Sequence, residues 1–225
     1  IPRDKLIAAT SQLISVPADL VSDAIDSLSE NGGLVCDKVA NLNVCYLTEL
    51  YEAETYTAER LKSMVGLKTK SSANIERLIT KLESLYDISY APLQKQSIEL
   101  ALNNRILVIT GGPGTGKTTI LKGILSLYDE LELETLLAAP TGRAAKRMSE
   151  LTGREASTIH RLLGAKMAED GETVVFSKHE GDPLNCDALV LDECSMVDIT
   201  LMSSLLKALK PGCRLVLVGD ADQLP

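Results

Sequence analysis

A glycine-rich run between two apolar segments constrains the fold of this chain more than any other feature. Residues 111–118 read Gly-Gly-Pro-Gly-Thr-Gly-Lys-Thr, which fits the pattern G-x-x-x-x-G-K-[S/T]. The run follows a strand-like segment at 106–110 and precedes a helical pattern at 119–128. Glycines let the backbone turn several N–H groups toward one anion, and the following helix points its positive end at the same place. The sequence therefore predicts a phosphate-binding loop at the end of a β-strand.

The side chains of this loop have distinct expected roles in binding a nucleoside triphosphate. Lys117 is expected to be catalytic, because its point charge reaches the β- and γ-phosphate oxygens. The Thr118 hydroxyl is expected to bind the Mg²⁺ that accompanies the nucleotide. The nucleotide-binding residues expected in and directly after the loop are Gly111, Gly112, Pro113, Gly114, Thr115, Gly116, Lys117, Thr118 and Thr119.

Three more strand-like runs follow along the chain, at 135–139, 188–192 and 214–218. They alternate with helical stretches, which indicates an α/β fold with a parallel sheet covered by helices. A less regular stretch at 165–187 contains a predicted hairpin around Gly171. In open α/β sheets of this kind, ligands bind at the carboxyl ends of the strands.

Acidic and amide side chains follow two of these runs. Asp192 and Glu193 end the run at 188–192, and two adjacent acids after a buried strand are costly unless they have a function. We expect Asp192 to hold Mg²⁺ and Glu193 to activate the attacking water as the catalytic base. After the last run, Gln223 is expected to sense the γ-phosphate as a catalytic residue, supported by Asp220 at the nucleotide.

The first 87 residues have a different pattern, so we expect a domain boundary between 1–87 and 88–225. Helical periodicity and two short β-like runs occupy 4–14, 17–30, 34–36, 44–47, 48–64 and 72–85. Two helices followed by a hairpin indicate a mostly helical, winged-helix-like domain. Such domains either bind DNA or only pack against neighbours, and the excess of acidic over basic residues in 1–87 favours packing.

Composition excludes several classes of protein. The chain of 225 residues carries a formal net charge of −8, which excludes a protein that coats nucleic acid by bulk positive charge. Its 45% of hydrophobic residues excludes intrinsic disorder.

Without a signal peptide or an apolar run of about 18 residues, we expect a cytoplasmic protein with no membrane partner. Five cysteines without a C-x-x-C pair indicate reduced thiols. Because the chain starts at Ile1 and stops at Pro225, we expect a fragment of a longer polypeptide.

Five motifs occur in the order found in superfamily 1 helicases. Besides the loop, they are A-P-T-G-R-A-A from residue 139, S-T-I-H-R-L-L-G from 157, L-D-E-C-S-M-V-D from 191 and V-G-D-A-D-Q-L-P from 218. Residues 88–225 most resemble the RecD-like 5′→3′ DNA helicases, including the helicase part of conjugative TraA proteins. The resemblance implies a first RecA-like motor domain, incomplete at its C-terminus, that uses ATP and Mg²⁺. It also implies that Gln94 binds the adenine edge, to which an amide both donates and accepts.

The resemblance assigns single-stranded DNA contacts to the second and third motifs. The residues expected to bind DNA are Pro140, Thr141, Arg143, Lys146, Thr158 and His160. Local charge agrees, because residues 139–166 hold a basic island. Its members are Arg143, Lys146, Arg147, Arg154, Arg161 and Lys166, against Glu150 and Glu155, or 6 − 2 = +4. Such an island suits a phosphate backbone, and the alternative is a solvated helix face.

Together these features and the resemblance predict an ATP-dependent DNA helicase. The resemblance implies that it translocates 5′→3′ on single-stranded DNA and unwinds duplex junctions in DNA repair, recombination or conjugation. The resemblance implies a second motor domain in cis after Pro225, with an arginine finger, and repair or conjugation subunits as partners. It also places the strand-separating insertion at 165–187. Two alternatives remain: a DNA-dependent ATPase that does not unwind, and an ATP- and DNA-binding switch module of a larger complex.

Overall fold

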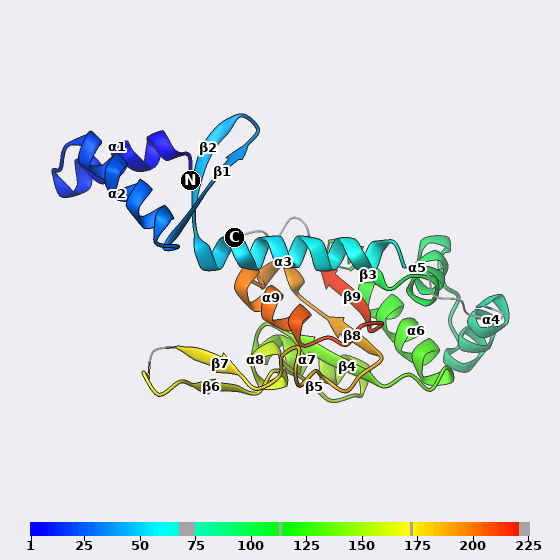
Figure 1. The fold of residues 1–225 in the computed structure, drawn as a ribbon. Coiled ribbons are helices and arrows are strands. Elements are labelled where there is room, and N and C mark those ends of the chain that lie inside the picture. The colour runs from blue at the N-terminus through cyan, green and yellow to red at the C-terminus, as the bar shows by residue number, and fades with distance from the viewer. Residues whose placement is uncertain (68–74, 113, 172, 221–225) are drawn as a thin grey trace. The chain divides into compact units, whose positions relative to one another are not determined.

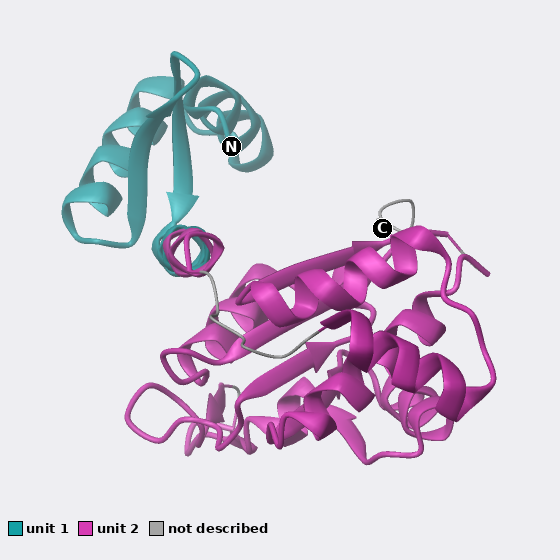
Figure 2. Cartoon of the chain, turned by 90° about the vertical axis from the view of Figure 1, so that its right-hand side faces the viewer, with its two compact units in different colours: residues 1–58 teal, residues 59–225 magenta. Residues whose placement is uncertain are grey.

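The computed structural model describes residues 1–67, 75–112, 114–171 and 173–220 of the chain. The chain forms two compact units, residues 1–58 and residues 59–225 (Figure 2). The helix α3 (Thr48–Val65) runs from the first unit into the second. The compact units thus divide within α3, whereas the domains expected from the sequence pattern divide at residue 87.

The first unit combines two helices with an antiparallel hairpin, as the sequence predicts (Figure 1). Its elements before α3 are α1 (Arg3–Ile14), α2 (Ala18–Glu30), β1 (Leu34–Val39) and β2 (Leu42–Leu47). The turn residues Ala40 and Asn41 have φ values of 48° and 66°, a conformation whose twist matches that of hairpin strands. Val21, Ile25 and Cys45 form the buried core of this unit.

A five-stranded parallel sheet lies at the centre of the second unit and confirms the predicted α/β fold. Its strands, in spatial order, are β3 (Ile106–Thr110), β9 (Arg214–Gly219), β8 (Ala188–Leu191), β4 (Thr135–Ala139) and β5 (Ala156–Thr158). All neighbouring pairs are parallel, so the carboxyl ends of the strands share one edge. Because β9 lies between β3 and β8, the carboxyl ends of these three strands are neighbours.

Helices flank this sheet (Figure 1). They include α5 (Pro92–Asn103), α6 (Lys117–Glu130), α7 (Gly142–Thr152), α8 (Ile159–Leu162) and α9 (Ile199–Lys207). All four residues of β8 are buried, which explains why this strand is a continuous apolar run and does not alternate. Within the described ranges, no helix has both the length and the apolar character needed to cross a membrane.

The helix α4 (Ile75–Tyr86) belongs to the core of the second unit. Ile79 and Leu82 are buried in the same cluster as Ile98 of α5 and Ile124 of α6. The sequence pattern assigns this helix to the N-terminal domain, because its own periodicity does not reveal which core buries it.

The stretch between α8 and β8 contains the predicted hairpin. It consists of β6 (Ala165–Met167) and β7 (Val174–Phe176), which pair antiparallel and extend from the body of the second unit (Figure 1). Met167, Val174 and Val175 are exposed on it. The hairpin therefore carries exposed apolar side chains on both of its strands.

Candidate functional site

The glycine-rich loop connects β3 to α6, as predicted. β3 ends at Thr110, and α6 begins at Lys117. Gly114 and Gly116 have φ values of 75° and 87°, a left-handed conformation that residues with a Cβ rarely adopt. Two of the glycines are thus required by the backbone path itself. Pro113, one of the expected nucleotide-binding residues, lies outside the described residues.

The Lys117 side chain folds back onto the loop that precedes it. Its Nζ donates hydrogen bonds to the carbonyl oxygens of Gly111 and Gly112, the second at 3.0 Å. The Thr115 hydroxyl donates to the same Gly112 oxygen, also at 3.0 Å. Both partners of Lys117 in these bonds are neutral, and ionised phosphate oxygens make stronger partners. The ammonium group is therefore held at the loop by bonds that an incoming triphosphate can replace.

Gln94 lies against this loop. A Cβ added at Gly116 would lie 2.5 Å from its Nε2 atom, so the amide nitrogen contacts the loop directly. Its Oε1 accepts a hydrogen bond from the Ala91 N–H at 2.9 Å and so caps α5, in which Pro92 is the first residue. The structure thus brings Gln94 into contact with Gly116, which lies 22 positions later in the sequence. The capping role was not predicted, although glutamine at the third helical position is its usual signal.

Asp192 and Glu193 follow β8 at the same edge of the sheet. The Asp192 N–H donates to Ala138 O of β4 at 3.0 Å, which fixes the acid beside the neighbouring strand. The Asp192 Oδ1 accepts from the Glu193 N–H at 2.9 Å. Glu193 has φ 53° and ψ 39°, a left-handed conformation that costs a non-glycine residue on the order of 1–3 kcal/mol. Strain of this kind occurs at functional sites, and here it falls on the expected catalytic base.

The segment after Glu193 packs against the end of β9. A Cβ at Gly219 would lie 2.8 Å from the Cys194 Sγ, so only glycine lets the two segments approach this closely. Burial, and next the nearby Asp192 carboxylate, raise the pKa of the Cys194 thiol. Asp220, directly after β9, is 7% exposed. Gln223, the expected γ-phosphate sensor, lies outside the described residues.

The oxygen donors at this edge fit a magnesium–nucleotide complex. Thr118 offers a hydroxyl and Asp192 a carboxylate, and Mg²⁺ is usually bound by one or two such groups together with substrate phosphates and water. A cage of three or more His, Cys, Asp or Glu side chains is absent from the described ranges. The donor set therefore suits a metal that arrives with a phosphate ligand.

Two of the expected DNA-binding residues cap helices after neighbouring strands. Thr141 follows β4 and its Oγ1 accepts from the Ala144 N–H at 3.2 Å, which caps α7. Thr158 ends β5 and its Oγ1 accepts from the Arg161 N–H at 3.2 Å, which caps α8. These hydroxyls stabilise the fold by a typical contribution of about 1 kcal/mol each, whatever else they contact.

The other expected DNA-binding residues lie around these caps. Arg143 and Lys146 are exposed on α7, and Lys146 lies 3.9 Å from the Glu150 carboxylate. His160 is exposed on α8, with its ring centroid 5.9 Å from that of Phe176 on β7. Pro140, between β4 and the Thr141 cap, is half-buried.

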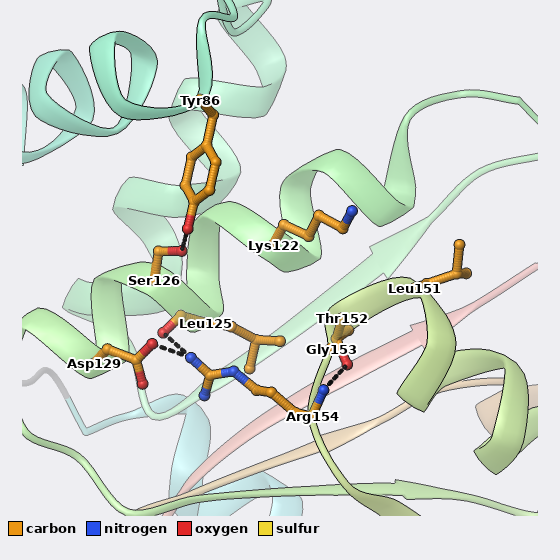
Figure 3. Close-up of a pocket in the computed structure, with 9 residues that line it drawn as sticks. All are labelled: Tyr86, Lys122, Leu125, Ser126, Asp129, Leu151, Thr152, Gly153 and Arg154. Atoms are coloured by element: carbon orange, nitrogen blue, oxygen red, sulfur yellow. Dashed lines mark hydrogen bonds and ion pairs between the residues drawn. The ribbon is translucent and has the colours of Figure 1, made fainter.

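One member of the basic island does not share this surface. The Arg154 guanidinium donates to the Asp129 carboxylate and to Leu125 O on α6 (Figure 3). These groups line a pocket of about 350 Å³ at the C-terminal ends of α6 and α7, where the Tyr86 and Ser126 hydroxyls meet at 2.8 Å. The loop lies at the opposite end of α6. The net charge of +4 therefore overstates the island, because Arg154 is neutralised within the fold.

Comparison with known proteins identifies the family to which the chain is similar. Residues 94–225 match the AAA domain family. The chain is 39% identical over 180 residues to the ATP-dependent RecD2 DNA helicase of Deinococcus radiodurans, covering 80% of this chain and 24% of that protein. It is 42% identical over 154 residues to the RecBCD enzyme subunit RecD of Mycobacterium tuberculosis, and this match covers 58% of this chain and 26% of that protein. It is also 40% identical over 120 residues to the ATP-dependent DNA helicase dda of Enterobacteria phage T4, covering 52% and 27%.

These relatives confirm the resemblance to RecD-like helicases that the order of the motifs indicates. The chain spans about a quarter of the length of the three proteins. Each relative therefore contains large regions that have no counterpart in these 225 residues.

Proposed function

The chain belongs to the AAA domain family, and on that premise we propose that its second compact unit is the first motor domain of an ATP-dependent DNA helicase of the RecD type. The observation that carries the proposal is the shared edge of the sheet. The glycine-rich loop after β3, the acids after β8 and Asp220 after β9 are brought there by three adjacent strands. The names of two of the relatives, the RecD2 helicase and the phage helicase dda, supply the reaction class, DNA unwinding driven by ATP.

The residues at this edge divide the work of ATP hydrolysis. The loop N–H groups and Lys117 bind the β- and γ-phosphates, and Thr118 and Asp192 hold Mg²⁺. A Mg²⁺ held by these two side chains would supply positive charge against the negative charge that develops on the phosphate oxygens. Glu193 accepts a proton from the water that attacks the γ-phosphorus. Its left-handed backbone at the end of β8 is a strained conformation of the kind found at functional sites, which supports this role.

Adenine recognition is assigned to Gln94. Its Oε1 accepts the hydrogen bond from the Ala91 N–H that caps the helix, and its Nε2 is the atom that contacts the loop. We therefore expect the amide to donate from Nε2 to an acceptor nitrogen of the base, while the helix cap holds the group in place. Gln223, with Asp220, is the proposed sensor of the γ-phosphate.

The DNA track is proposed on the exposed side chains that follow β4 and β5. Arg143 and Lys146 on α7 supply positive charge to the phosphate backbone, and His160 on α8 adds a ring for base stacking. The hairpin of β6 and β7, with its exposed apolar side chains, is the proposed strand-separating element. Translocation 5′→3′ requires a second motor domain with its arginine finger, which we propose follows in cis. The proposed setting is the cytoplasm, with repair, recombination or conjugation subunits as partners.

The experiment that tests this function is steady-state ATP hydrolysis by the full-length protein that contains this chain, with and without single-stranded DNA. We expect DNA to stimulate hydrolysis and Glu193→Gln to abolish the stimulated rate. Lys122→Ala is the matched control, because Lys122 is an exposed cation on α6 outside the loop. An equal rate of ATP hydrolysis with and without DNA would overturn the helicase proposal in favour of the switch module.

Unwinding of a duplex with one single-stranded tail separates the helicase from an ATPase that only moves on DNA. We expect strand separation with a 5′ tail and little with a 3′ tail. DNA-stimulated hydrolysis without strand separation on either substrate would establish the non-unwinding alternative.

A further inference from the structure

Two cysteines face each other across the hairpin of the first unit. Cys36 on β1 and Cys45 on β2 are directly opposed in the strand register, and their Sγ atoms lie 3.6 Å apart. The register is fixed by the two-residue turn at Ala40 and Asn41, whose positive φ values close the hairpin without a bulge. The two thiols are thus neighbours by construction of the hairpin.

The backbone pattern makes this the closer of the two kinds of cross-strand pair. The Cys45 N–H donates to Ile1 O at 2.8 Å, and the Cys45 carbonyl accepts from the Ile1 nitrogen at 2.9 Å. Both groups therefore point away from β1, so Cys36 and Cys45 form a non-hydrogen-bonded pair. Such pairs have Cα atoms about 4.5 Å apart, inside the range of about 4.4–6.8 Å that a disulfide spans. A bond between the sulfurs requires no shift of register.

The two thiols differ in their access to solvent. Cys36 is exposed, whereas Cys45 is 4% exposed and packs with Val21 and Ile25. Burial is the main cause that raises the pKa of the Cys45 thiol. A reagent in solution can therefore react with the exposed Cys36 thiol first, whereas the buried Cys45 thiol is reached only through Cys36.

Cys36 also lines a pocket of about 410 Å³. The other residues of its wall are Arg3, Asp37, Lys38 and Asn43. Arg3 is paired with Asp26 at 2.7 Å, so cationic and anionic groups both lie near the thiol. A lining of this kind suits a zwitterionic, peptide-like molecule.

We propose that Cys36 and Cys45 form a redox-active dithiol that a low-molecular-weight peptide disulfide oxidises to an intrahairpin disulfide. Cys36 loses its proton to water and attacks one sulfur of the small disulfide, whose other half leaves as a thiolate. Cys45 then loses its proton to water and attacks the Cys36 sulfur, which releases the second half as a thiolate. The protein loses two electrons and two protons, and the small disulfide gains them as two thiols.

The second unit contains another pair of neighbouring thiols, which differs from the hairpin pair in access. Cys186 and Cys213 precede β8 and β9, and their Sγ atoms lie 3.8 Å apart. They are only 5% and 3% exposed, so a small disulfide cannot reach either sulfur in the folded domain. If access decides reactivity, this pair stays reduced while the hairpin pair reacts.

The test exposes the full-length folded protein to oxidised glutathione, blocks remaining thiols with an alkylating agent, and maps each cysteine by mass spectrometry. We expect a disulfide between Cys36 and Cys45, with Cys186 and Cys213 alkylated only after unfolding. Failure of Cys36 and Cys45 to become linked overturns the proposal. So does formation of the Cys186–Cys213 bond at an equal rate, because distance alone would then decide reactivity.

Two variants test the order of the steps. Cys36→Ser, at an exposed position that should not affect folding, is expected to leave Cys45 free of glutathione and of any intrahairpin disulfide. Cys45→Ser is expected to stop the reaction at a mixed disulfide on Cys36. Glutathione attached to Cys45 in the Cys36→Ser variant would overturn the assignment of Cys36 as the entry thiol.

Discussion

Lys117 lies at the N-terminal end of α6 and Arg154 is held at its C-terminal end, and the partners of these two cations differ. At the N-terminal end, Lys117 donates to the backbone carbonyls of Gly111 and Gly112. At the C-terminal end, Arg154 donates to the Asp129 carboxylate (Figure 3). A neutral carbonyl is a weaker partner than a carboxylate, so Lys117 can pass to a phosphate at little cost. Moving Arg154 would leave an unpaired carboxylate. The neutral partners of Lys117 thus suit a role in binding phosphate, and the charged partner of Arg154 suits a structural role.

The largest effect is expected from removing the charge at the N-terminal end. Lys117→Ala should lower ATP hydrolysis by about 10²–10³-fold, because it removes a preorganised donor to charge that develops on the phosphates. Thermal unfolding should change little, since the bonds that are lost go to neutral carbonyls in a half-buried loop. Steady-state kinetics and a melting curve on one preparation measure both. An unchanged rate of ATP hydrolysis with a lowered Tm would show that Lys117 has a structural role and not a role in binding phosphate.

A backbone substitution should break the loop without touching either cation. Gly116→Ala places a Cβ 2.5 Å from the Gln94 amide at a φ of 87°. The strain should cost about 1–3 kcal/mol, observed as weaker binding of a fluorescent nucleotide or as a lower Tm. Gly142→Ala is the matched control, because no atom lies within 4 Å of the added Cβ. Equal nucleotide affinity together with an equal Tm in the two variants would contradict the strained loop.

An intermediate effect is expected on DNA binding. Arg143 is exposed on α7, whereas Arg154 is paired within the fold. Arg143→Ala should weaken binding of single-stranded DNA a few-fold and lower the salt slope by about 1. Arg154→Ala should leave that slope unchanged. Titrations of a labelled oligonucleotide at several salt concentrations measure the slopes. An equal loss of DNA affinity in both variants would show that Arg154 also contacts DNA.

The smallest effect is expected from the ion pair itself. The Arg154 and Asp129 side chains are 30% and 56% exposed, and pairs this exposed contribute about 0.2–1 kcal/mol. A double-mutant cycle with Arg154→Met and Asp129→Asn measures the coupling by urea unfolding. The coupling should shrink at high salt while hydrolysis per folded molecule stays constant. A loss of hydrolysis in the single variants would show that this end of α6 also acts on the nucleotide.

Four strands of the parallel sheet were predictable from sequence because each is a short, mostly apolar run, and this holds even for the edge strand β3, in which Val108 and Thr110 are exposed. β3 and β4 match the predicted segments at both ends, and β8 and β9 match within one residue. A parallel strand covered on both faces is a short apolar run bounded by turn residues. β5 escaped prediction, since its three half-buried residues, Ala-Ser-Thr, form no such run.

Side-chain partners were predictable only where they are close in sequence. The strand–loop–helix order of residues 106–128 follows from local propensity, so the positions of Lys117 and Thr118 could be expected. The Cys194 contact with Gly219 and the Gln94 contact with Gly116 join separate elements. The left-handed backbone at Glu193 is likewise invisible in the sequence, because glutamate carries no preference for it.

The amino-acid sequence by itself determined that this chain has a parallel α/β sheet with a phosphate-binding loop and two acids at one edge. These features depend on hydrophobic runs, glycines and neighbouring residues, all of which are local in the chain. Only the tertiary structure decided that Arg154 is paired with Asp129, that α4 joins the core of the second unit and that Cys45 is buried while Cys36 is exposed. Each of these depends on which distant segment covers a side chain, and burial and pairing are properties of the packed molecule.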